Sequence, residues 1–137
     1  MLLMVKKILF ILLAALTFQS CTTNENDLIC TDEFVQITVE VVDESGDAVD
    51  GVQIQITEKE TDTILPCDEY LCKPFPDEGS YIIMHDGFFG EISETGQTFV
   101  VEGSKDGFGF QEEFTFRSGE CHVEKISGPE TVTLTER

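Results

Sequence analysis

The sequence predicts an all-β domain: a seven- to eight-stranded antiparallel β-sandwich that follows an N-terminal signal peptide and a short tether. Several windows alternate apolar and polar residues with the period of two that marks a strand with one buried face. Clusters of Gly, Asp and Ser separate these windows at short intervals, and no window after the signal shows a convincing helical period. Abundant phenylalanine can supply the core without any tryptophan.

The first two predicted strands lie at residues 34–42 and 52–57, where Val and Ile alternate with polar residues. Between them, "DESGDAVDG" has the composition of a turn centred on Gly46. We therefore expect these two strands to form an antiparallel pair.

The middle of the domain contributes a strand at "SYIIMHD" (80–86), a short strand or bulged return at "FFGEIS" (88–93) and a strand at "QTFVVEG" (97–103). The next strand, "FGFQEEFTFR" (108–117), places four phenylalanines on one face with Glu112 as the only exception. Two explanations remain open for Glu112: a bulge shifts the register, or the residue lies at a rim of the sandwich.

Two last strands, "CHVEKIS" (121–127) and "TVTLTE" (131–136), are expected to form a closing hairpin around a turn at Gly128-Pro129.

Residues 1–20 have the order of a signal peptide: Lys6 and Lys7, an apolar run too short to span a bilayer, then small or polar residues. The segment "FQSC" resembles the bacterial lipoprotein cleavage box and implies lipidation of Cys21 as the new N-terminus. Residues 21–30 then form a flexible tether and residues 31–137 the domain. Thr22 after the cysteine favours the outer membrane in that resemblance, with the leaflet left open.

Without its signal the chain carries 6 basic against 27 acidic residues, a formal net charge of −21. Such a chain is repelled by nucleic acid, because phosphate binding needs clustered Lys and Arg. The acids are spread along the chain, which is typical of a solvated surface. Cation binding is the alternative, and the oxygen-rich segments "DESGDAVD" and "PDEG" could hold calcium although neither fits the EF-hand spacing.

Four cysteines remain after Cys21, and an even number in an exported chain favours two disulfides. Four cysteines allow three connectivities; we expect Cys67–Cys72 within one loop and Cys30–Cys121 across the domain. A zinc site built from Cys67, Cys72, Cys121 and His122 is the alternative, but its spacing is looser than in usual zinc sites. We predict no metal site and no cofactor.

Neither histidine predicts catalysis. Cys121 and His122 are neighbours, and alternate strand positions would turn their side chains to opposite faces. His85 is expected to pair with the adjacent Asp86 at a strand end, and no nucleophile elbow accompanies them. We assign no catalytic residue and expect no enzyme activity.

The segment 60–79, with three of the four prolines and two cysteines, is predicted to be a long exposed loop. Loops of this kind often carry binding residues, and the candidates here are Tyr70, Leu71 and Phe75. The alternative interpretation is that Leu71 and Phe75 cover the edge of the sandwich.

The first strand pair, "ITVEVVDESGDAVDGVQIQI", resembles the opening of the carboxypeptidase regulatory-like domain through Asp43 and Gly46, with Ala48 where that family commonly has Pro. The resemblance extends over residues 31–134. It implies a transthyretin-like (prealbumin-like) sandwich and a noncatalytic accessory or binding role, and it brings no catalytic residues.

These observations favour a noncatalytic, lipid-anchored β-sandwich of the cell envelope that acts as a binding or accessory module. Its expected partners are the membrane, through the anchor, and an envelope protein or glycan. The alternative is a structural component of a larger outer-membrane or surface assembly, in which a partner pairs with an exposed sheet edge.

Overall fold

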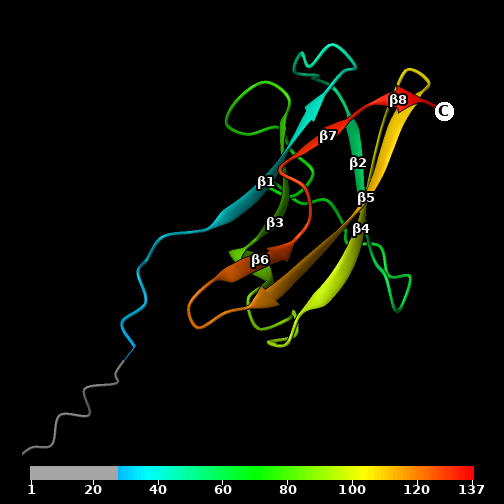
Figure 1. Ribbon diagram of the computed structural model, residues 1–137. Helices are drawn as coiled ribbons and strands as arrows, with labels where there is room; N and C mark the ends of the chain where they lie inside the picture. The colour runs from blue at the N-terminus through cyan, green and yellow to red at the C-terminus, as the bar shows by residue number, and fades with distance from the viewer. Residues whose placement is uncertain (1–27) are drawn as a thin grey trace, which may run out of the picture.

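The computed structural model describes residues 28–137, which fold into a two-layered β-sandwich (Figure 1). The predicted signal peptide, the predicted lipidation site Cys21 and most of the predicted tether lie outside the described residues. One sheet has three strands in the order β3-β1-β7, and the other has five, in the order β2-β4-β5-β6 with β8 also paired to β5. The strands are β1 (Gln36–Val42), β2 (Gln53–Glu58), β3 (Ser80–His85), β4 (Gln97–Lys105), β5 (Phe108–Ser118), β6 (Val123–Ser127), β7 (Thr131–Thr133) and β8 (Thr135–Glu136).

The predicted all-β class and the sandwich are confirmed. The only helical element in residues 28–137 is a single 3₁₀ turn, η1 (Asp86–Phe88). Within this part of the chain, no helix has both the length and the apolar character needed to cross a membrane.

The prediction that the first two strands pair with each other is wrong. β1 pairs with β3 and β7, whereas β2 pairs with β4 in the opposite sheet. The turn after β1 closes only one antiparallel bridge, Val42 to Ala48, and the chain then crosses to the other layer. β1 and β2 both bury alternate residues in the same core. Strands from opposite sheets of a sandwich therefore show the same apolar–polar alternation as the two strands of a hairpin.

The predicted closing hairpin is also wrong. β6 pairs antiparallel with β5, but β7 runs parallel to β1 in the other sheet. The chain crosses between the layers at Gly128, whose φ is +124° and where a Cβ would lie 2.3 Å from the Phe114 ring. Leu134 then turns into the core, so "TVTLTE" is divided between β7 and β8.

The segment "FFGEIS" forms no strand; it is part of η1 and the turns that follow it. The carbonyl of Phe88 accepts hydrogen bonds from the N–H groups of Glu91 and Ile92, and Ile92 is buried. Glu112 lies at a rim. Its register with β4 is unbroken, and it is exposed between the part of β5 that pairs with β6 and the part that pairs with β8.

The loop 60–79 is less free than its composition predicts, because two parts of it line sheet edges. Residues 72–75 bond to β3: the N–H of Cys72 donates to the carbonyl of Ile82 and the N–H of Phe75 to that of Ser80. Residues 63–65 bond in the same way to the end of β2. Each segment covers an edge that would otherwise present unpaired backbone groups.

Gly79, at the entry to β3, has a φ of +75°, and a Cβ there would lie 2.9 Å from both the Ala48 Cβ and the Val41 carbonyl oxygen. We expect Gly79→Ala to lower the free energy of unfolding by about 2 kcal/mol or more, because it adds a steric clash to the strain of a left-handed alanine. Urea denaturation followed by tyrosine fluorescence measures the change. Gly90→Ala is the matched control, since Gly90 has a φ of +81° with no atom within 4 Å of the added carbon. Equal losses in the two variants would contradict the steric argument.

Candidate functional site

Both predicted disulfides are present. Cys30 bonds Cys121 with a Cα–Cα distance of 5.4 Å, and Cys67 bonds Cys72 with 5.6 Å. The zinc alternative is therefore wrong, because these sulfur atoms are bonded to each other and cannot serve as thiolate ligands. Among residues 28–137, no three His, Cys, Asp or Glu side chains come together as a metal-binding group.

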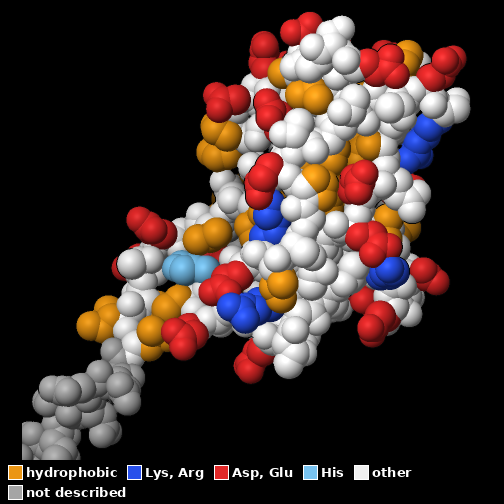
Figure 2. All heavy atoms as spheres, in the orientation of Figure 1, with side chains coloured by type: hydrophobic (Ala, Val, Ile, Leu, Met, Phe, Trp, Pro, Cys, Tyr) orange, Lys and Arg blue, Asp and Glu red, His pale blue; other side chains and the backbone are white. Residues whose placement is uncertain are grey.

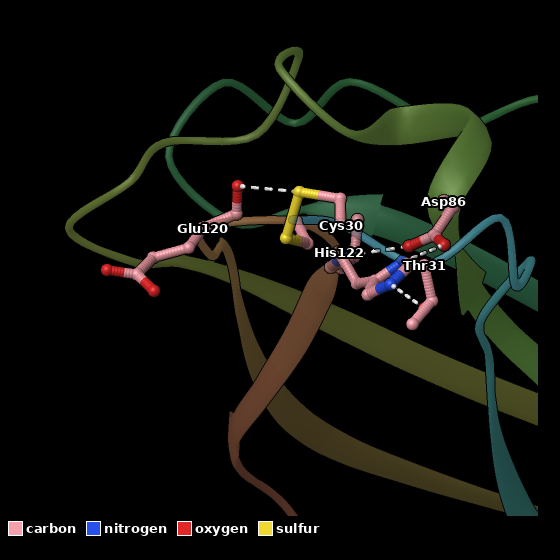
Figure 3. Close-up of a disulfide and its surroundings, with 7 residues drawn as sticks. Cys30, Thr31, Asp86, Glu120 and His122 are labelled. Carbon is pink, nitrogen blue, oxygen red and sulfur yellow. Dashed lines mark hydrogen bonds and ion pairs between the residues drawn. A yellow bond between two sulfur atoms is a disulfide. The ribbon is translucent and has the colours of Figure 1, made fainter. Parts of the chain in front are cut away.

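Cys121 and His122 lie in the turn between β5 and β6 rather than on a strand, and their side chains serve different contacts (Figure 3). His122 Nδ1 donates to Asp86 Oδ2 at 2.6 Å, and its Nε2 is 3.3 Å from the Thr31 hydroxyl. Asp86 also accepts the N–H of Val35 at 2.8 Å and that of Val123 at 2.9 Å. One carboxylate thus joins the segment before β1, the η1 turn and the start of β6.

Burial acts to raise the pKa of the Asp86 carboxyl, but the hydrogen bonds from the Val35 and Val123 N–H groups and from His122 together hold it below its usual value. The carboxylate is therefore ionised at neutral pH. The predicted pairing of His85 with Asp86 is wrong, because Asp86 turns to His122.

The contacts that run from Thr31 through His122 to Asp86 have the hydroxyl–imidazole–carboxylate order of a nucleophilic triad. Its hydroxyl-to-nitrogen distance of 3.3 Å exceeds the 2.6–3.2 Å range typical of an activated nucleophile. Both oxygens of Asp86 also hold backbone N–H groups. What these contacts do in the fold is join residue 31, the η1 turn and the start of β6.

His85, at the end of β3, is a second buried imidazole, with 4% of its side chain exposed. Its Nδ1 accepts the N–H of Gly87 at 3.0 Å, so in the neutral ring the proton lies on Nε2, which donates to Asp68 Oδ2 at 3.0 Å. The Oδ1 atom of Asp68 accepts two further N–H groups, from Tyr70 and Leu71, at 2.7 Å each.

Burial acts to raise the pKa of the Asp68 carboxyl. The hydrogen bonds from the Leu71 and Tyr70 N–H groups and from the His85 ring outweigh this effect, so the pKa lies below its usual value. Asp68 is therefore an ionised carboxylate that accepts a hydrogen bond from His85 Nε2. Through Asp68, the His85–Asp68 pair holds the backbone N–H groups of Tyr70 and Leu71 in place.

Two exposed aromatic rings meet above His85. The centroids of Phe34 and Tyr70 are 5.4 Å apart with their planes tilted by 48°, and they lie 5.4 Å and 5.8 Å from the His85 ring. Phe34 is 51% exposed and Tyr70 40%. We call Phe34, Tyr70 and His85 the aromatic platform. It lies at the end of the sandwich where the described chain begins (Figure 1).

The two exposed rings of the platform, Phe34 and Tyr70, each belong to a segment that a disulfide anchors. Cys67–Cys72 closes a short loop around Tyr70, and Cys72 adopts a φ of +66° inside it. Cys30–Cys121 anchors the segment that carries Phe34, and the bond from Val35 N–H to Asp86 holds the other side of that segment. Exposed aromatic rings fixed in this way lose little conformational entropy when they bind a ligand.

Of the three predicted binding residues, the platform includes only Tyr70. Leu71 was wrongly expected to be an exposed contact, because it is fully buried in the hydrophobic core. Phe75 is exposed, but it pairs with Ser80 at the opposite end of β3, about 17 Å from His85 at 3.3 Å per residue.

The sequence interpretation missed Phe34 and His85 as members of the platform. A signal for Phe34 is present, since Cys30 and Cys67 are each followed by Asp, Glu and an aromatic residue: "CTDEF" and "CDEY". No comparable signal marks His85.

Comparison of the chain with protein-family models, with curated proteins and with solved structures found no match. The resemblance to the carboxypeptidase regulatory-like domain stays a prediction.

Proposed function

We propose that the protein is a noncatalytic binding module, anchored to the outer membrane of a bacterial cell envelope through lipidated Cys21, with the aromatic platform as its contact surface. The observation that carries the proposal is the pair of exposed rings, Phe34 and Tyr70, each on a segment that a disulfide anchors. Rigid aromatic residues are enriched where proteins bind partners, because they bury a large area at a low entropic cost.

The position of the platform supports the same proposal. It lies at the end of the domain where residue 28 enters, and a chain of nine residues, the separation of Cys21 and Cys30 in the sequence, spans at most about 30 Å when extended. A partner in or near the membrane is within reach of such a surface.

The alternative is a structural component whose partner adds a strand to an exposed edge. Its support is β6, which pairs with a strand only on its β5 side among the described residues and which exposes Ile126. β6 is short, carries Glu124 and Lys125 and borders a register shift, which are features that protect an edge from pairing. We therefore favour the platform.

Site-specific photocrosslinking in intact cells tests the proposal. A photoreactive phenylalanine analogue at position 70 is expected to capture an envelope species, whereas the same analogue at Phe108, an exposed ring at the opposite end, is not. The Cys21→Ser variant should no longer be found in the membrane fraction, and its analogue at position 70 should capture no partner. Capture from Ile126 on β6 but not from position 70 would support the edge-pairing alternative, and equal capture at 70 and 108 would overturn the platform.

A further inference from the structure

Two Asp-Glu-aromatic tripeptides converge on the aromatic platform. Residues 32–34 follow Cys30 and residues 68–70 follow Cys67, and the two aromatic rings that end them are 5.4 Å apart. Four acidic residues therefore lie within two sequence positions of the paired aromatic residues. Corresponding residues of the two tripeptides are 36 positions apart in the sequence, so the tertiary fold brings the two segments together.

Three of these carboxylates are free to contact a ligand. Asp32, Glu33 and Glu69 are exposed, and their side chains have no hydrogen bond or ion pair with any described residue. Asp68 is the structural member, bound to His85 and to two backbone N–H groups.

No cation of the described chain neutralises this surface through an ion pair. His85 accepts a hydrogen bond at Nδ1 and is neutral in that arrangement. Five of the six Lys and Arg side chains in residues 28–137 are bonded elsewhere: Lys59, Lys105, Arg117, Lys125 and Arg137. Lys73, the sixth, forms no ion pair with a described residue. Figure 2 shows the wider setting, with many acidic and few basic side chains on the visible face.

We propose that the aromatic platform binds a basic segment of a protein partner and seats an Arg or Lys side chain on the rings of Phe34 and Tyr70. Aromatic faces attract cations, and ionised carboxylates beside them strengthen that attraction. An extended segment with several basic residues matches exposed carboxylates that adjoin Phe34 and Tyr70 in the sequence on two separate chain segments, whereas a neutral glycan would leave them unpaired. This inference rests on the proposed function, because it uses the same surface and adds the chemistry of the ligand.

Binding of a defined peptide tests this inference. The probe is a capped nonapeptide that alternates Gly and Arg, titrated calorimetrically into the mature chain, purified from membranes in a neutral detergent, at about 0.15 M salt. We expect Phe34→Ala with Tyr70→Ala to weaken binding about tenfold, and the triple variant Asp32→Asn, Glu33→Gln, Glu69→Gln to weaken it by a similar factor. Because these side chains are exposed, tyrosine fluorescence and denaturation midpoints should verify that each variant folds.

Two controls separate this site from general attraction to an acidic protein. A peptide with citrulline in place of Arg keeps the shape without the charge and should bind about tenfold more weakly. A second triple variant removes three exposed carboxylates at the opposite end of the sandwich and should change binding less than twofold: Glu44→Gln, Glu78→Gln and Glu136→Gln. Equal weakening by the two triple variants, or equal binding of the two peptides, would overturn the inference.

The peptide and the crosslinking experiments fail independently. If position 70 captures a partner in cells while the Arg peptide does not distinguish the variants, the platform is a binding surface for a ligand that is not cationic. A chitin oligomer and vesicles of zwitterionic lipid, titrated in parallel, then identify a glycan or a membrane as the ligand. If neither experiment supports the platform, both proposals are wrong.

Discussion

Replacement of both Cys30 and Cys121 by serine is expected to lower the free energy of unfolding by about 4 to 5 kcal/mol in the chain-entropy model, because their disulfide closes a loop of 91 residues. Domains of this size have total stabilities of about 5 to 15 kcal/mol, so the loss is a large fraction of the whole. The bridge also joins the two layers: Cys30 precedes β1 in the three-stranded sheet, and Cys121 follows β5 in the other. Urea denaturation of the double variant under nonreducing conditions measures the change.

The second disulfide provides the control. Cys67→Ser with Cys72→Ser opens a loop with a sequence separation of only 5, for which the same model gives about 2 kcal/mol. A larger loss for this pair than for Cys30 and Cys121 would show that strain or residual structure, rather than loop length, determines the stabilisation. The mutant pairs also differ in their local effect, since each releases one ring of the platform: Phe34 in the first case and Tyr70 in the second.

The strands were predictable because alternation reports local burial. Val39 and Val41 in β1, and Ile54 and Ile56 in β2, point into one core, and the period of two reveals this without knowledge of partners. The pairing was not predictable by the same means. A hairpin and two strands that face each other across a sandwich give the same pattern, which explains the errors at β1–β2 and β6–β7.

The platform was only partly predictable for a related reason. Tyr70 could be found because prolines and cysteines mark its loop, but its contact with Phe34 depends on a pairing that composition does not encode. His85 looks in the sequence like a turn residue beside Asp86, yet it is buried and bonded to Asp68, 17 residues earlier in the chain. Leu71 is buried although it adjoins the exposed Tyr70, because both lie in a short disulfide loop with a turn from the Tyr70 carbonyl to the Lys73 N–H and no strand alternation.

Replacement of Asp86 by asparagine is expected to lower the free energy of unfolding at pH 7 by about 2 to 3 kcal/mol. The carboxylate, 12% exposed, accepts hydrogen bonds from Val35, Val123 and His122. In the asparagine variant an NH₂ group replaces one carboxylate oxygen, so one or more of these N–H donors loses its acceptor. The loss should reach the platform as well, because the bond to Val35 holds the residue next to Phe34. Denaturation curves at several pH values measure both the size of the effect and its pH dependence.

The sign of that pH dependence follows from the lowered pKa of Asp86. A carboxyl whose pKa is lower in the folded than in the unfolded chain stabilises the fold fully above its ordinary value of 3.8, and this stabilisation is lost as pH falls through the folded value. The gap between wild type and Asp86→Asn should therefore be constant at neutral pH and narrow below about pH 4. The wild type keeps further acid sensitivity from Asp68 and Glu58, whose pKa values are also lowered.

Glu44→Gln is the control for charge alone, since it removes one negative charge from an exposed turn at the opposite end of the sandwich. It should change the free energy of unfolding by less than about 0.5 kcal/mol. Because the chain is so acidic, relief of general repulsion would make both neutralised variants more stable. A stable Asp86→Asn protein would thus show that repulsion outweighs the three hydrogen bonds, whereas a loss confined to Asp86→Asn would show that this carboxylate braces the segment that carries Phe34.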